Sequence, residues 1–116
     1  MDLIREIIFY KNYFRDFFDE LDEKTKEKVD EVLFMIAILE RIPTKFFKNI
    51  EGIKGLYEIR IEYKSNIYRI FCCFDKGNII VLFNAFQKKT QKTPSKEIEK
   101  AQRLMLEYFK NTKNGN

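Results

Sequence analysis

Residues 57–86 read YEIRIEYKSNIYRIFCCFDKGNIIVLFNAF, and this run determines the architecture of the chain. Apolar and polar side chains alternate over 57–63, which predicts a strand with one apolar and one polar face. Residues 67–74 and 79–86 are almost entirely apolar, so both are expected as buried strands, with 79–86 central in the sheet. Two short turns separate the three strands, and Gly77 suits the positive φ that a tight hairpin requires. The pattern predicts a small antiparallel sheet.

The residues before this run predict a strand and a helical hairpin. Ile4–Tyr10 favours a short first strand, although the start of a helix is an alternative there. Apolar side chains at helical spacing predict two helices, over 13–21 and 25–41. Asp22 or Thr25 can cap the second helix. Because few residues join the two helices, we expect them to pack antiparallel.

The residues on either side of the three strands complete the expected fold. Pro43 ends the second helix, and residues 43–55 are expected to form a connector with turns at its glycines. A last helix begins near Thr93-Pro94, and residues 111–116 are expected to fray. The predicted order is β-α-α-β-β-β-α, an α+β fold with the helices on one face of an antiparallel sheet.

Length and composition favour one soluble domain over residues 1–116. The chain is 45% hydrophobic and 16% aromatic, which is typical of a folded protein. We find no apolar run long enough for a membrane span and no signal peptide, so a cytoplasmic protein is expected. Cys72 and Cys73 are adjacent in a strand and the chain has no His, so two core thiols are expected rather than a metal site or a disulfide.

Charge is distributed unevenly along the chain. The net charge is +4, with −4 in residues 1–42, +3 in 43–87 and +5 in 88–116. This asymmetry indicates a face for an anionic partner, and a solvated lysine-rich helix is the alternative. The positive charge is most concentrated in the segment from Phe83 to Pro94. There an apolar strand runs into a loop with three lysines and no acid.

Two arginines stand out in the strands. Arg60 lies on the polar side of the first strand of the run, and Arg69 interrupts an otherwise apolar strand. An unpaired buried guanidinium is costly, so Arg69 must either be paired or face a groove filled with solvent. Glu58 and Glu62 are its candidate partners in a plain cross-strand ion pair.

Three segments resemble the RelE/HigB toxin superfamily, and specifically its phage-derived Gp49-like branch. They are Leu56–Arg60, Tyr68–Ile70, and the NAFQKKTQKTP run of 84–94 with Glu97, Ile98 and Ala101 after it. The resemblance implies a ribosome-dependent mRNA endonuclease, the toxin of a type II toxin–antitoxin pair that inhibits translation. The implied partners are a HigA-like helix-turn-helix antitoxin, the ribosome and mRNA, with operator DNA bound only through the antitoxin. It implies no metal and no cofactor.

The resemblance also assigns site residues. Matching positions imply catalytic roles for Arg60, Arg69, Lys88 and Lys89. They imply RNA-binding roles for Lys64, Phe86, Gln87, Thr90 and Lys92. For two groups of these residues a plain structural role is the alternative: the lysines after residue 87 can simply keep a loop soluble, and Phe86 can belong to the core.

One position departs from the family pattern, because Asn84 stands where many relatives carry His. RNA cleavage by attack of the 2′-hydroxyl on its own phosphate needs a base, an acid and cationic stabilisation of the phosphorane. Arginine stays protonated and suits a phosphate clamp. Lys88 or Lys89 is therefore the candidate acid or base, and Glu58 or Glu62 is a second candidate base. The alternative function is a non-catalytic RNA- or protein-binding module, either a phage-derived protein or a decayed toxin.

Overall fold

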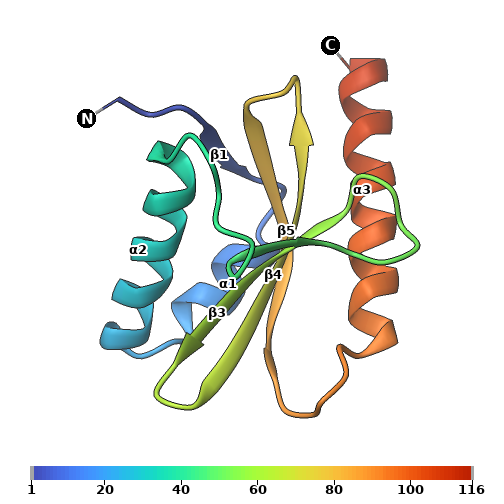
Figure 1. Cartoon of the computed structure of the whole chain (residues 1–116). Helices are drawn as coiled ribbons and strands as arrows, with labels where there is room; N and C mark the ends of the chain where they lie inside the picture. Colours follow the sequence, from blue (N-terminus) through green and yellow to red (C-terminus); the bar gives the residue numbers. More distant parts are fainter. Residues whose placement is uncertain (1, 116) are drawn as a thin grey trace.

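The computed structural model describes the backbone of residues 2–115 and the side chains of residues 2–112. A five-stranded sheet in the order β1-β5-β4-β3-β2 forms its centre (Figure 1). The strands are β1 (Glu6–Phe9), β2 (Phe47–Asn49), β3 (Tyr57–Tyr63), β4 (Asn66–Asp75) and β5 (Ile79–Lys88). The helices are α1 (Tyr13–Asp19), α2 (Glu23–Ile38) and α3 (Ser95–Gly115). The α+β class and the three-stranded meander are confirmed.

The sheet is mixed rather than purely antiparallel. β1 pairs with β5 in parallel, whereas the other three pairings are antiparallel. The alternation of apolar residues shows that a strand exists but does not give the direction of its pairing. That direction depends on the route by which α1 and α2 carry the chain away from β1. β5 is an interior strand, as expected from its apolar run, but β4 occupies the centre.

Two features of the sheet were not predicted. β2 forms within the expected connector, where Phe47–Asn49 pair with Tyr57–Ile59 of β3. A bulge also interrupts the β4–β5 pairing, because Ile70 pairs with Ala85 whereas Cys72 pairs with Leu82. Phe71 therefore faces two residues of β5, Phe83 and Asn84, instead of one.

The helices cover both faces of the sheet, so the expectation of helices on one face was wrong. Figure 1 shows α2 and α3 on opposite sides of the strands. Each face has its own apolar cluster: Ile36 of α2 packs with Ile59 and Ile70 on one, and Leu104 of α3 packs with Phe71 and Phe83 on the other. Strands that are apolar on both faces must be covered on both. The apolar run of 67–74 therefore already indicated that β4 is covered on both faces.

The adjacent cysteines follow the same division. Cys72 belongs to the cluster under α2, and Cys73 belongs to the cluster under α3. Both thiols are free and buried. Burial raises the pKa of both thiols, that of Cys73 to about 12, so neither is a nucleophile near neutral pH. The expectation of two core thiols is confirmed.

α2 ends earlier than its apolar pattern predicted. Its last residue is Ile38, and Leu39 has extended backbone angles. The Arg5 guanidinium donates hydrogen bonds to three carbonyls at this end, those of Ile36, Leu39 and Glu40, at 2.6–2.9 Å. The bond to Ile36 satisfies an acceptor that every helix C-terminus leaves free, and all three bonds hold the chain before β1 against the end of α2.

The cap of α2 makes stability depend on pH. Asp22 accepts a hydrogen bond from the Thr25 amide at 2.8 Å, and this bond lowers the pKa of Asp22 from its ordinary value of 3.8. Since folding depresses this pKa, the contribution is present above the ordinary pKa and is lost as the pH falls through the folded value. We expect Asp22→Ala to lower Tm at neutral pH and to reduce the decline of Tm in acid. Asp30→Ala, on the exposed side of α2, is the control; equal acid sensitivity of the Asp22 variant and the wild type would contradict this assignment.

Tyr108 joins α3 to the end of β4. Its hydroxyl donates to Asp75 Oδ2 at 2.7 Å, and burial together with Asp75 raises the pKa of Tyr108 to about 12. We expect Tyr108→Phe to cost about 1.5–3 kcal/mol in urea unfolding, the range for hydrogen bonds to charged groups. Because this pKa is raised from 10.0, the contribution is present below pH 10 and is lost as the pH rises through 12. Tyr57→Phe, whose ring stacks on Phe47, is the matched control and should cost less.

No helix in the described part of the chain is both long and apolar enough to cross a membrane. The described backbone of α3 is helical to Gly115, which contradicts the expected fraying over 111–115, and residue 116 lies outside the described residues.

Candidate functional site

Arg60 and Arg69 lie directly opposite each other on β3 and β4. Their neighbours Ile59, Ile61 and Ile70 belong to the cluster under α2, so the two arginines point to the other face, toward the side of α3. The Arg60 side chain is 35% exposed, whereas that of Arg69 is 3% exposed. Like charges at opposed positions repel, so this arrangement requires a neutralising group.

Glu58 supplies that group, because its carboxylate lies between the two guanidinium groups. Glu58 Oε1 is 3.7 Å from Arg60 Nε, and Glu58 Oε2 is 3.7 Å from Arg69 Nε. Both contacts are ion pairs that are too long for hydrogen bonds. Of the two candidate partners for Arg69, the structure therefore places Glu58 in contact with it. Glu62 is exposed and lies four residues further along β3 than Glu58.

Two buried polar atoms of this cluster have unused hydrogen-bonding capacity. Within the described residues, neither Glu58 Oε2 nor Arg69 Nε has a hydrogen-bond partner. Arg69 donates one bond, from Nη1 to the carbonyl of Tyr68 at 3.1 Å. Burial lowers the pKa of Arg69, Glu58 opposes this shift and Arg60 adds to it. Because Glu58 Oε2 is buried, a ligand can reach this carboxylate only through Oε1, which faces the half-exposed Arg60.

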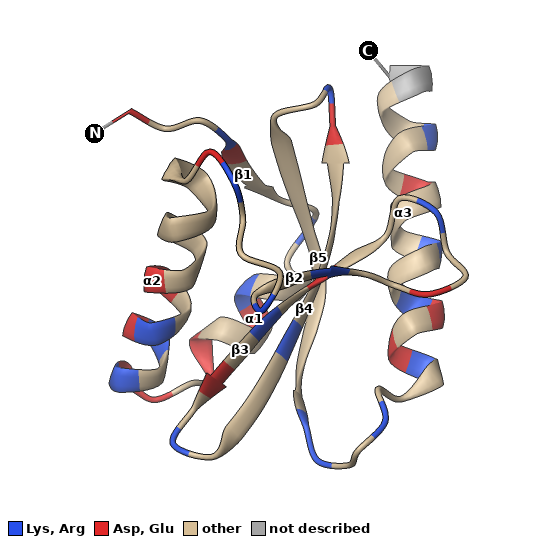
Figure 2. Ribbon diagram, viewed as in Figure 1, with Lys and Arg blue, Asp and Glu red and all other residues tan. Residues whose placement is uncertain are grey.

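The lysines of the loop after β5 lie at the same end of the sheet. Lys88, the last residue of β5, pairs with Ile67 two residues beyond the pair formed by Arg69 and Phe86, and it is half-buried. Lys89 and Lys92 are exposed, and Thr90 donates to the Lys92 carbonyl at 2.8 Å. Figure 2 shows basic residues on the loop between β5 and α3 and on the β3–β4 turn, the turn that contains Lys64.

Phe86 and Gln87 point to opposite faces of the sheet. Phe86 lies on the arginine face and stacks on Phe71, with ring centroids 5.8 Å apart. Gln87 donates to Asn66 at 3.1 Å, and its partner on β4 is Tyr68, which lies in the cluster under α2. Gln87 therefore does not share a face with the two arginines, and its RNA-binding role stays a prediction. A one-residue step along a strand reverses the side chain, and the bulge shifts which residues of β5 face α3.

Asn84 connects β5 to the first turn of α3. Its Nδ2 donates to the Glu97 carbonyl at 3.1 Å and to Glu97 Oε1 at 3.0 Å, and the residue is 3% exposed. These two bonds close the loop that carries Lys88, Lys89 and Lys92. Sequence reasoning singled out Asn84 for a missing His and did not find this role. The signal was a polar residue inside an otherwise apolar strand, residues 79–86.

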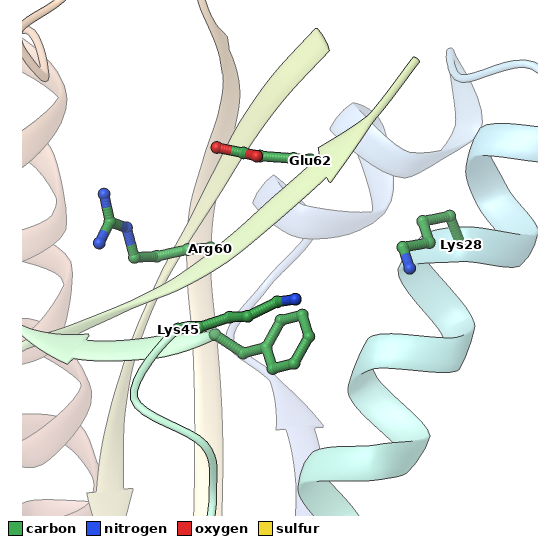
Figure 3. Close-up of a pocket in the computed structure, with 5 residues that line it drawn as sticks. Lys28, Lys45, Arg60 and Glu62 are labelled. Atoms are coloured by element: carbon green, nitrogen blue, oxygen red, sulfur yellow. The ribbon is translucent and has the colours of Figure 1, made fainter. Parts of the chain in front are cut away.

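A pocket of about 470 Å³ lies beside Arg60 and was not predicted. It is lined by Lys28, Lys45, Phe46, Arg60 and Glu62 (Figure 3). In Figure 3 the Lys45 side chain extends toward α2, where Lys28 lies, while Arg60 and Glu62 leave β3 on the other side. Lys28 and Lys45 come from segments that sequence analysis treated as a surface helix and a connector. No sequence motif linked Lys28 or Lys45 to Arg60.

Comparison with known proteins identifies the family of this chain. Residues 16–106 match the model of the family described as "Phage derived protein Gp49-like". The chain belongs to this family. A comparison with curated protein sequences finds no match.

The fold of this Gp49-like protein is also found in a solved structure. An archaeal RelE–RelB complex from Pyrococcus horikoshii OT3 contains a chain with a TM-score of 0.56 and 18% sequence identity. The match covers 78% of the Gp49-like protein and 100% of the archaeal chain. At this identity the likeness shows the fold alone. The resemblance to the Gp49-like family is therefore confirmed by the family match, and the structural match shows that the fold is RelE-like.

Proposed function

We propose that this protein is the toxin of a type II toxin–antitoxin pair and cuts mRNA on the ribosome. Membership of the Gp49-like family and the RelE-like fold support a RelE-like toxin. The observation that carries the proposal is the Arg60–Glu58–Arg69 cluster next to the lysine loop. It combines a carboxylate that can accept a proton with cations that can hold a phosphate.

The proposed reaction needs no metal. Glu58 takes the proton of the 2′-hydroxyl, whose oxygen attacks the adjacent phosphorus. The bond to the 5′ oxygen breaks, and Lys88 or Lys89 protonates that oxygen, leaving a 2′,3′-cyclic phosphate and a 5′-hydroxyl. Arg60 is half-exposed and holds the phosphate. Arg69 is too buried for a direct phosphate contact, so it acts by positioning Glu58.

The proposed RNA contacts follow the same geometry. Lys64, Thr90 and Lys92 lie on the exposed turns at this end of the sheet and suit backbone contacts. Phe86 is a half-buried platform next to Phe71 and can support a base only through its free edge. Gln87 lies on the other face, so its predicted RNA contact is separate from this site.

We also propose a cognate antitoxin as partner. The archaeal structure is a RelE–RelB complex, which supports a protein partner of this kind for a RelE-like fold. A HigA-like helix-turn-helix antitoxin, with operator DNA bound only through it, is the specific form proposed here. An adjacent gene for a helix-turn-helix protein whose co-expression relieves growth arrest would support it.

The proposal is tested by mapping RNA ends after induction of the protein in growing cells. Primer extension should show cuts in phase with codons, and Arg60→Ala should remove them because no exposed guanidinium then remains in the cluster. Lys110→Ala, an exposed charge change elsewhere on α3, should leave the cuts in place. Soluble, folded wild-type protein that leaves both mRNA and translation intact would refute the proposal.

One observation favours a second candidate, a non-catalytic RNA- or protein-binding module. Arg69 is buried and paired, and the chain has no His for proton transfer. RNA binding without codon-phased cleavage, equal in the wild type and in Glu58→Gln, would identify this function instead.

A further inference from the structure

The pocket beside Arg60 exists because β2 is short. β2 pairs only with Tyr57–Ile59, and the amide of Arg60 donates to the Phe46 carbonyl at 2.8 Å as the last link between the two segments. Beyond this point β3 continues to Tyr63 without β2 beside it. The space between the open edge of β3 and α2 is the 470 Å³ pocket.

Positive charge exceeds negative charge in this pocket. Three cations line it, Lys28, Lys45 and Arg60, against one carboxylate, Glu62. The nearest acid to Lys28 is Glu31 at 3.6 Å, and its side chain is 73% exposed, so it neutralises little. A concave site of this sign attracts an anion.

An aromatic ring accompanies the cations. Phe46 lines the pocket and is half-buried, and the Lys45 ammonium lies 5.1 Å from its ring centroid. Aromatic rings beside lysines are the recurring elements of sites for single-stranded nucleic acid, where bases stack and cations hold phosphates. The volume lies within the usual range for a small-ligand site and can take one nucleotide.

Arg60 belongs both to this pocket and to the candidate cleavage cluster. When one phosphate of an RNA strand is bound to Arg60, the next nucleotide along the edge of the sheet therefore lies at the pocket. We propose that the pocket binds the nucleotide next to the cleaved bond, with Lys28 and Lys45 on its phosphate and Phe46 against its base. This inference rests on the proposed function and extends it to a second RNA subsite, formed by α2 and the segment before β2.

The test measures binding of a short single-stranded RNA with 2′-O-methyl groups, which cannot be cut, by fluorescence anisotropy over a range of salt. Each phosphate contact on single-stranded RNA contributes about 0.7 to the salt slope. Lys28→Gln/Lys45→Gln removes both contacts to this one phosphate and should therefore reduce the slope by about 0.7. Between about 50 and 200 mM salt, the wild type should lose about 2.6-fold more affinity than this variant.

Lys54→Gln/Lys110→Gln is the matched control, because it removes the same charge from two exposed lysines that do not line the pocket. It should leave the slope near the wild-type value. Equal slopes for the two double variants would overturn the proposal, as would a wild type that fails to bind the RNA. The proposed cleavage is judged separately, by codon-phased cuts in cells.

A second probe distinguishes RNA from an acidic protein segment. The same variants are titrated with a glutamate-rich peptide of equal length. The subsite predicts that Lys28→Gln/Lys45→Gln and Phe46→Leu both weaken RNA binding, with Phe46→Leu affecting RNA and not the peptide. A larger effect on the peptide than on RNA would assign the pocket to a protein partner and overturn the proposal.

Discussion

Glu58→Gln is expected to reduce mRNA cleavage by about 10²–10⁴-fold, the contribution of a positioned general base. The amide has the same shape as the carboxylate but does not accept the 2′-hydroxyl proton. Glu58 is the carboxylate in contact with both guanidinium groups, and its Oε2 has no hydrogen-bond partner within the described residues. Single-turnover cleavage on programmed ribosomes measures the effect.

Glu62→Gln is the matched control, with the same chemical change four residues along the same face of β3. It is exposed and should keep cleavage within a few-fold of the wild type, although it lines the neighbouring pocket. If both variants cleave RNA equally well, Glu58 is not the general base, and Lys88 or Lys89 takes the proton of the 2′-hydroxyl instead. Circular dichroism melts of both variants separate a loss of chemistry from a loss of folding.

Arg69→Ala is expected to destabilise the protein by about 3–5 kcal/mol, because it leaves the Glu58 carboxylate buried without its main partner. Arg69 is 3% exposed, and Glu58 is 7% exposed. Since small domains are stable by only about 5–15 kcal/mol, this change alone threatens folding. Urea unfolding at neutral pH measures the change in the free energy of unfolding.

Arg60→Ala is the control for this measurement. It removes a guanidinium at the same distance from the same carboxylate, but from a half-exposed position, and should cost about 1 kcal/mol or less. Glu58→Leu/Arg69→Met should recover most of the stability, since an apolar pair of similar volume often replaces a buried ion pair without loss. Comparable costs for Arg60→Ala and Arg69→Ala would show that burial does not govern this cluster.

These two predictions change how loss of activity is interpreted. An Arg69 variant that fails to cleave RNA does not by itself identify a phosphate contact, because the same change weakens the fold. Arg60 and Glu58 are the informative positions for chemistry, since Arg60 is half-exposed and Gln keeps the shape of Glu58.

Local patterns predicted the strands of the site correctly. The alternation in 57–63 placed Arg60 away from the apolar face, and the interrupted run of 67–74 identified Arg69 as a residue that needs a partner. The helix cap by Asp22 was also available, because an N-cap involves residues only three positions apart. Each of these features depends on neighbours along the chain.

The positions that sequence analysis missed depend on pairing between distant segments. The bulge opposite Phe71 brings Asn84 under α3, and it decides that Phe86 rather than Gln87 shares the face of the two arginines. Neither consequence follows from the spacing of apolar residues, because a single inserted residue shifts every later side chain by one step.

The sequence by itself determined the α+β class, the three-stranded meander, the core thiols and the concentration of positive charge after residue 42. These are local or additive properties, such as period, turn residues and charge. Only the tertiary structure decided the parallel pairing of β1, the covering of both faces, the choice of Glu58 over Glu62 and the pocket formed with Lys28 and Lys45. The physical reason is that register and burial, rather than the neighbours in the chain, set which side chains meet.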